Sequence, residues 1–139
     1  MKKTIFIDMD GVLVQKGELN FQEHKLKKGF FLDKDPVRGA VESFQILSEM
    51  HDCYIASTPV WNNVYCWSEK RIWVEKHLGK AAEKRLILLH HKNLLNGDYL
   101  VDDTKDHGVQ MFKGEHIHFG IGHFPDWPSV IEYLMSKQG

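Results

Sequence analysis

Residues 4–13 read Thr-Ile-Phe-Ile-Asp-Met-Asp-Gly-Val-Leu, a short apolar run that stops at two aspartates and a glycine. A continuous apolar run predicts a strand buried in a parallel sheet, and ligands of open α/β sheets bind at the carboxyl ends of such strands. Asp8 and Asp10 therefore stand where an α/β protein places its functional groups. Two carboxylates so close together repel each other unless a cation or a shared proton relieves them. The simplest relief is a hard divalent ion such as Mg²⁺, which prefers oxygen ligands and carries bound phosphate.

The composition is that of an ordinary globular protein. The chain has 139 residues, of which 42% are hydrophobic and 27% are charged, and its formal net charge is −1. This length suffices for one domain with a core, and the charge gives no strong indication of nucleic-acid or membrane-surface binding. Two cysteines are too few for a disulfide framework. No apolar run approaches membrane-spanning length, and no signal-peptide pattern precedes the first strand, so we expect a cytoplasmic protein.

Apolar runs of β type alternate with helical patterns along the chain. The β-type runs lie at residues 4–7, 53–56, 86–89, 99–101 and 116–119, and the helical patterns at residues 37–50, 61–78, 105–112 and 127–136. Pro36 stands at a natural start for the first helix, and Asp126 could cap the last one. This alternation predicts βαβ units and a parallel sheet covered by helices on both faces.

The Asp-x-Asp-Gly segment predicts nucleophilic chemistry on phosphorus. Asp8 is the predicted nucleophile, because a carboxylate can attack phosphorus and form an aspartyl-phosphate. Asp10 is placed to protonate the leaving oxygen and later to activate water. Gly11 allows a sharp turn and a close approach of its backbone to a phosphate. The alternative is a strand end with capping aspartates. A calcium loop does not fit, because Val12 and Val14 stand where oxygen ligands would be needed.

Polar side chains also follow the next two predicted strands. Ser57 and Thr58 come directly after the run at 53–56, where hydroxyl groups can bind phosphate oxygens together with helix N-terminal amides. An ordinary helix N-cap is an equally common interpretation. Lys92 follows the run at 86–89 and could supply a fixed positive charge to a transferring phosphoryl group. The alternative for Lys92 is a solvated lysine.

Two adjacent aspartates end the fourth apolar run. Asp102 and Asp103 directly follow residues 99–101, and acids at the end of a buried strand are costly unless a metal or a lysine relieves them. Asp102 is the predicted metal ligand. Asp103 is predicted to orient the site or to pair with Lys92. An acidic loop without a function is the alternative.

In this order, the four segments resemble the haloacid dehalogenase superfamily of phosphotransferases. The resemblance implies a three-layer α/β/α Rossmann-like fold, with a parallel sheet of order 3-2-1-4-5 in one domain of residues 1–139. It also implies a minimal cap inserted after the first strand, at about residues 14–35. Finally, it implies a Mg²⁺ ion held by the Asp8 side chain, the Asp10 carbonyl and Asp102.

Within that superfamily the chain is similar to the 5'(3')-deoxyribonucleotidase family. The similarity rests on the ten-residue step from Lys92 to Asp102 and on four short segments, Asp8-Met9-Asp10-Gly11-Val12, Gly29-Phe30-Phe31, Pro36-Val37-Arg38-Gly39-Ala40 and Ser57-Thr58-Pro59. It implies a Mg²⁺-dependent phosphomonoesterase that acts on a 5'(3')-deoxyribonucleotide or a similar small phosphorylated metabolite. The similarity leaves the oligomeric state undetermined.

Aromatic residues near the predicted site could select such a substrate. Phe21, Phe30 and Phe31 lie in the predicted cap, and Trp61 follows Pro59. Their rings could stack on a nucleobase, or the phenylalanines could form a small hydrophobic core of the cap.

Two other functions stay open. A minimal cap leaves the site accessible enough for a macromolecular phosphate, on a phosphoprotein or a nucleic-acid end. A catalytically silent interaction module of the same fold is the other alternative. The presence of both Asp8 and Asp10 argues against it, because a pure binding module has no need for an acid/base carboxylate.

Overall fold

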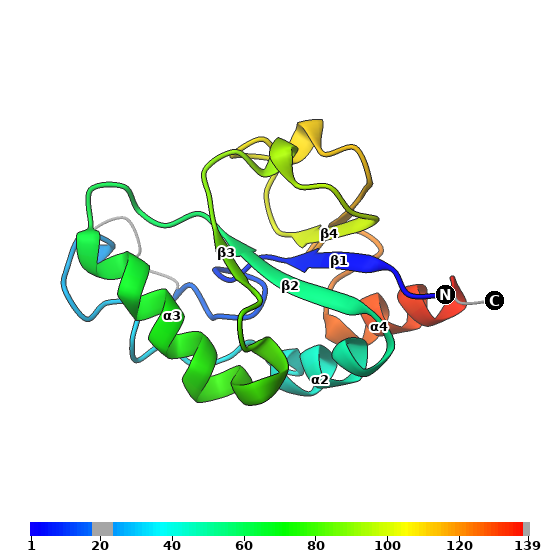
Figure 1. Cartoon of the computed structure of the whole chain (residues 1–139), viewed down its shortest axis with the longest axis horizontal. Helices are drawn as coiled ribbons and strands as arrows, with labels where there is room; N and C mark the ends of the chain where they lie inside the picture. Colours follow the sequence, from blue (N-terminus) through cyan, green and yellow to red (C-terminus); the bar gives the residue numbers. More distant parts are fainter. Residues whose placement is uncertain (18–23, 138–139) are drawn as a thin grey trace.

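A parallel sheet carries the carboxylates at one edge. The computed structural model describes residues 1–17 and 24–137. Over these residues the sheet has five strands in the order β3-β2-β1-β4-β5, all parallel to their neighbours (Figure 1). The strands are β1 Thr4–Ile7, β2 Asp52–Ser57, β3 Leu86–Leu88, β4 Tyr99–Asp102 and β5 Glu115–His118. The predicted strand order of 3-2-1-4-5 and the α/β Rossmann-like class are confirmed.

The two faces of the sheet have different coverings. Three α-helices cover one face: α2 Ala40–Met50, α3 Val64–Leu78 and α4 Trp127–Ser136. Ile5 and Ile7 of β1 pack into the core on this face, whereas Phe6 belongs to a second cluster on the opposite face, as the two-residue period of a strand requires. The 3₁₀ turns η2 Lys92–Leu94 and η3 Val109–Met111 and the loops around them cover that opposite face (Figure 1).

The helix predicted over residues 105–112 was wrong. The structure forms only η3 within this range. His107 and Gly108 have φ angles of 55° and 85°, in the left-handed region that an α-helix does not use. The apolar spacing of this segment instead places Val109 and Phe112 in the second core cluster.

The helix predicted over residues 127–136 is confirmed together with its cap. The backbone N–H of Ser129 donates to Asp126 Oδ1 over 3.0 Å, which satisfies one of the free amides at the helix start. The other two α-helices begin three residues later than predicted. No helix within residues 1–17 and 24–137 is long and apolar enough to span a membrane.

Strand register brings the functional side chains to one edge. Ile7 is paired with Ile55 of β2 and with Val101 of β4, so the residues that follow these strands lie next to one another. The backbone N–H of Asp8 extends the ladder by donating to the Val101 carbonyl over 2.9 Å.

Residues 24–35 lie against α3. The Glu69 carboxylate accepts hydrogen bonds from the backbone amides of Gly29 and Phe31, at 2.6 and 3.2 Å. Farther along α3, the Trp73 indole donates to the Lys34 carbonyl over 2.8 Å. These hydrogen bonds hold residues 29–34 of the predicted cap against α3, beside the carboxyl ends of the strands. The single domain and the cap boundaries at 14–35 stay predictions, and part of the cap, with Phe21, lies outside the described residues.

Candidate active site

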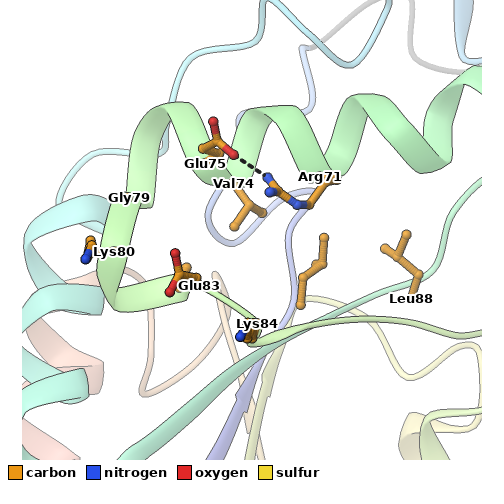
Figure 2. A pocket seen from close by; sticks show the side chains of 10 residues that line it. Arg71, Val74, Glu75, Gly79, Lys80, Glu83, Lys84 and Leu88 are labelled. Carbon is orange, nitrogen blue, oxygen red and sulfur yellow. Dashed lines mark ion pairs between the residues drawn. The ribbon is translucent and has the colours of Figure 1, made fainter.

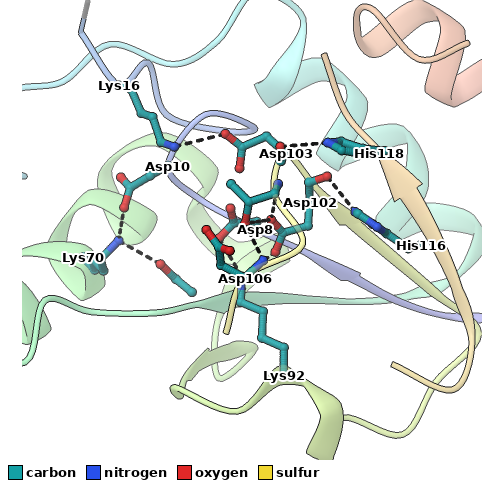
Figure 3. Close-up of polar contacts among 12 residues, drawn as sticks. Asp8, Asp10, Lys16, Lys70, Lys92, Asp102, Asp103, Asp106, His116 and His118 are labelled. Carbon is teal, nitrogen blue, oxygen red and sulfur yellow. Dashed lines mark hydrogen bonds and ion pairs between the residues drawn. The ribbon is translucent and has the colours of Figure 1, made fainter. Parts of the chain in front are cut away.

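Lys92 lies between two buried aspartates at the carboxyl edge of the sheet (Figure 3). Its Nζ atom donates to Asp8 Oδ1 over 2.9 Å and to Asp102 Oδ2 over 2.6 Å. Asp8 directly follows β1, and Asp102 ends the neighbouring strand β4. The structure therefore brings together three residues that the sequence analysis chose from separate segments. Lys92 is not the solvated lysine of the alternative interpretation, because it is buried.

Asp103 has a different partner from the one predicted. Its carboxylate lies 3.2 Å from Lys16 Nζ, whereas Lys92 pairs with Asp8 and Asp102. The predicted pairing of Asp103 with Lys92 was therefore wrong. Successive side chains at a strand end point in different directions, which explains why Asp102 and Asp103 meet different lysines.

Three carboxylates form a group that could hold a cation. One oxygen each from Asp8, Asp102 and Asp103 lies within 4.8 Å of the others. These are hard oxygen donors, the ligand type that Mg²⁺ prefers, and they lie close enough together for a group that could hold a metal ion. Asp103 belongs to this group directly. Ligation by the Asp10 carbonyl stays a prediction, because the group consists of carboxylate oxygens alone. The residues fit the predicted ion, with Asp103 as a further candidate ligand beside Asp8 and Asp102.

The electrostatics of the group indicate an excess of negative charge. Burial raises the pKa of Asp8 from 3.8 to about 6; Lys92 opposes the rise, while Asp102 and Asp10 add to it. Burial also raises the pKa of Asp103, and Asp8 adds to that rise. For Lys92, burial favours the neutral amine, but the two carboxylates outweigh it and raise the pKa. A bound cation would relieve this excess.

Asp10 is held by a lysine that the sequence analysis missed. Lys70 on α3 is fully buried, with 0% exposure, and its Nζ donates to Asp10 Oδ2 over 2.7 Å and to Ser57 Oγ over 2.8 Å. Asp10 Oδ1 has no hydrogen-bond partner among the described residues. One carboxylate oxygen of Asp10 is thus fixed by Lys70, while the other is buried with its hydrogen-bonding capacity unused among the described residues.

The sequence did contain an indication of Lys70. Cys66, Lys70 and Trp73 are spaced by four and three residues on α3, and all three are buried. This spacing is that of one helix face. A lysine at an apolar position of a helix face needs a partner, because an isolated buried ammonium is costly.

Gly11 allows the turn after β1 to pass close to the acid pair. Its φ angle is 85°, in the region that glycine adopts readily. A Cβ atom at this position would lie 2.1 Å from Asp103 Oδ2. The glycine is therefore required by a close approach to Asp103, in addition to any approach to phosphate.

A cavity of about 370 Å³ opens above the cluster. Asp8, Asp10, Lys92, Asp102 and Asp103 line it, together with Thr58, Trp61 and His90 and other residues of the same edge. Thr58 Oγ1 is buried and has no hydrogen-bond partner among the described residues. The predicted site residues of four segments therefore share one cavity, with an unused hydroxyl group inside it.

Of the predicted cap aromatics, the two described ones, Phe30 and Phe31, do not line this cavity. Phe31 is buried, and its ring lies 5.0 Å from Lys70 Nζ. Phe30 packs edge to face on Phe31 with ring centroids 4.9 Å apart. Their placement supports the interpretation as a small hydrophobic core and gives no support to base stacking by either ring. Ser57 is also absent from the lining; it is buried, and its hydroxyl group accepts a hydrogen bond from Lys70.

Two histidines of the edge strand β5 contact the backbone carbonyls of Asp102 and Asp103. His116 Nε2 lies 2.9 Å from the Asp102 carbonyl, and His118 Nε2 lies 3.0 Å from the Asp103 carbonyl. A carbonyl can only accept, so each ring donates from Nε2. The two rings are stacked with centroids 5.0 Å apart. These contacts fix the backbone from which both carboxylates project (Figure 3).

A larger cavity of about 660 Å³ lies between α3, η1 Gly79–Ala82 and β3 (Figure 2). Its apolar lining includes Val74, Leu86 and Leu88. The ion pair between Arg71 and Glu75, at 2.9 Å, lies on its rim. Among the described residues that line it, there is no cluster of carboxylates around a buried lysine. The smaller cavity at the strand ends is therefore the candidate active site.

The sheet order and the carboxylate–lysine site together define an α/β protein of the haloacid dehalogenase superfamily. A family model described as 5' nucleotidase, deoxy (pyrimidine), cytosolic type C protein matches residues 17–126. The chain belongs to this family. Its enzyme class is therefore that of the nucleotidases, which are phosphoric monoester hydrolases.

Individual relatives agree with the family. A protein of Vibrio phage KVP40, provisionally named a 5'(3')-deoxyribonucleotidase, is 48% identical over 147 residues, which cover 98% of this chain and 86% of the phage protein. A Bordetella pertussis protein with the same provisional name is 47% identical over 76 residues, 54% of this chain and 41% of that protein. The human cytosolic-type 5'(3')-deoxyribonucleotidase is 38% identical over 77 residues, 54% of this chain and 38% of its own length. The match thus spans most of the phage protein and about two fifths of the other two.

Proposed function

We propose that the chain is a Mg²⁺-dependent phosphomonoesterase that hydrolyses a deoxyribonucleotide, or a closely similar small nucleotide, through an aspartyl-phosphate. One observation carries the proposal: Asp8 faces the 370 Å³ cavity within a group of three carboxylates beside Lys92. The names of the phage and human relatives, both 5'(3')-deoxyribonucleotidases, support the substrate class.

The first half of the reaction uses Asp8 and Asp10. An oxygen of Asp8 attacks phosphorus, the bond from phosphorus to the sugar oxygen breaks, and Asp10 gives a proton to that leaving oxygen. In the second half Asp10 takes a proton from a water molecule, which attacks phosphorus and releases inorganic phosphate and free Asp8. Lys70, which donates to one oxygen of Asp10 over 2.7 Å, is placed to orient this carboxyl group in both halves.

Lys92 and Thr58 are suited to the phosphoryl oxygens. Lys92 supplies a fixed positive charge next to the nucleophile, and Thr58 has a hydroxyl group without a partner among the described residues. Such preorganised groups favour charge that develops in the transition state. A Mg²⁺ ion held by Asp8, Asp102 and Asp103 would neutralise the carboxylates and the phosphate, so that an anionic nucleophile can approach an anionic substrate.

A substrate panel tests this function. Purified protein with Mg²⁺ is assayed on 5'- and 3'-deoxyribonucleotides, a sugar phosphate, a phosphopeptide and a 5'-phosphorylated oligonucleotide. We expect the deoxyribonucleotides to have the highest kcat/KM and Asp8→Asn to lose more than about 10³-fold in rate. Asp33→Asn, the same change at an exposed position, is the matched control and should retain activity. Preference for the phosphopeptide or the oligonucleotide would replace this proposal by a macromolecular phosphatase, and inactivity on all five substrates would favour the silent module.

A further inference from the structure

Three rings gather at the outer part of the candidate site. Trp61 lies between β2 and α3, Trp67 lies in α3, and His90 follows β3. The ring centroids of Trp61 lie 6.1 Å from Trp67 and 5.6 Å from His90, with interplanar angles of 73° and 72°. Trp67 and His90 are 5.9 Å apart. Trp61 thus makes T-shaped contacts with two rings from separate elements, and neither ring stacks in parallel on it.

Trp61 is unusually exposed for a ring with this support. Its exposed fraction is 70%, and both Trp61 and His90 line the cavity that contains Asp8 and Lys92. A single exposed apolar residue needs no explanation. An indole that contacts two other rings and lines a charged cavity is different, because its exposed part adjoins the place where a phosphorylated substrate would bind.

His90 adds an unused polar atom to this cluster. Its Nε2 is buried and has no hydrogen-bond partner among the described residues. Most buried polar atoms in native proteins have a partner. The absence is explained if a ligand supplies the partner, and Nε2 can serve as donor or acceptor according to the tautomer.

Phe30 and Phe31 do not supply this aromatic surface, because neither of them lines the cavity. Of the described residues that do, Trp61, His90 and His107 carry aromatic rings. Trp61 has the largest apolar face among them.

We infer that Trp61, supported by Trp67 and His90, is the platform on which the substrate's nucleobase stacks, and that His90 Nε2 binds a polar atom of the base or sugar. This inference rests on the proposed function, since it names the part of a nucleotide that lies beyond the phosphate. Every base offers a π-face to such a platform. The enzyme should therefore distinguish nucleotides from sugar phosphates without a base more strongly than it distinguishes one base from another.

The test compares a deoxyribonucleotide with 2-deoxyribose 5-phosphate, which keeps the phosphate and sugar but has no base. For Trp61→Ala we expect the ratio of the two kcat/KM values to fall by about 10- to 100-fold, the range that base–aromatic stacking supports. Most of the loss should lie in KM for the nucleotide, because stacking is similar in the ground state and the transition state. Trp61→Phe should recover much of the ratio. Tyr65→Ala is the matched control, a partly exposed aromatic residue on α3 that does not line the cavity.

The outcomes separate the platform from the proposed function. If wild-type protein hydrolyses no nucleotide but hydrolyses another phosphate ester, the proposed function itself fails. If wild-type protein prefers nucleotides and Trp61→Ala keeps the wild-type ratio, the platform is refuted and the function stands. A direct measurement uses catalytically silent Asp8→Asn with Mg²⁺: a deoxyribonucleotide should quench tryptophan fluorescence more strongly than 2-deoxyribose 5-phosphate, and this difference should disappear in Asp8→Asn/Trp61→Phe. Persistence of the full difference in that double variant would also refute the platform.

Discussion

Replacing Asp8 by asparagine should abolish turnover and yet stabilise the metal-free protein at neutral pH. The folded protein raises the pKa of Asp8 from 3.8 to about 6, mainly through burial. Between these two values the folded state binds more protons than the unfolded state, so the stability contributed by this group falls as pH rises. Above pH 6 the charged carboxylate costs about 3 kcal/mol, the free energy that corresponds to this shift. The asparagine side chain of the variant would resemble the neutral acid at every pH.

Solvent screening should reduce this free-energy cost only slightly, because the Asp8 carboxylate is buried. Asp8 is only 8% exposed. Lys92 also donates to Asp102 over 2.6 Å, so it has a second carboxylate partner when Asp8 is neutral. The variant therefore removes an excess negative charge and does not leave the lysine unpaired. A gain of about 3 kcal/mol would raise Tm by roughly 10 °C in a domain of this size.

Denaturation in urea with EDTA measures the effect. At pH 8 we expect Asp8→Asn to be more stable than wild type by about 3 kcal/mol, and at pH 4.5 we expect most of this advantage to be lost. Asp33→Asn at an exposed position should show no comparable pH-dependent gain. A variant equal to or less stable than wild type at pH 8 would refute the reasoning. Added Mg²⁺ should stabilise wild type more than the variant, because the variant has lost a charged ligand.

Three further changes test other parts of the site. Lys70→Met should lower stability by about 3–5 kcal/mol in urea denaturation, because it leaves Asp10 without its buried partner; a loss below about 1 kcal/mol would show that this ion pair is not a net stabiliser. Asp10→Asn should slow alkyl phosphates much more than p-nitrophenyl phosphate, since a good leaving group needs little protonation, and equal losses would remove Asp10 from the acid role. EDTA should silence the enzyme and Mg²⁺ restore it, with a higher Mg²⁺ requirement in Asp102→Ala; activity that EDTA leaves unchanged would contradict the metal site.

The positions of several site residues could be predicted from the sequence, because polar side chains directly follow the predicted strands. Asp8, Lys92 and Asp102 lie after apolar runs, and parallel strands bring such positions to one edge. The sequence analysis therefore grouped residues that lie far apart along the chain. It also predicted the strand order, through a resemblance carried by the same residues.

The partners of these residues were harder to predict, because they depend on side-chain direction and on the surrounding fold. Lys70 lies in the middle of a helix, and only the packing of α3 against the sheet shows that it reaches Asp10. The pair between Asp103 and Lys16 depends on the path of the chain after β1. Phe30 and Phe31 lie in a segment that is held against α3 by the hydrogen bonds of Gly29 and Phe31 to the Glu69 carboxylate. No local sequence pattern indicates these hydrogen bonds.

The central position of β1 has a consequence for synthesis of the protein on the ribosome. β1 lies between β2 and β4, so β1 emerges from the ribosome well before its second neighbour, a strand that ends at Asp102. At about 5–20 residues per second, the apolar segment from Thr4 to Ile7 waits for roughly 5–20 s before both of its neighbours exist. During that time it has unpaired edges, which are prone to association with other chains. The nascent chain should therefore depend on protection of this segment, such as chaperone binding, until β4 has left the ribosome.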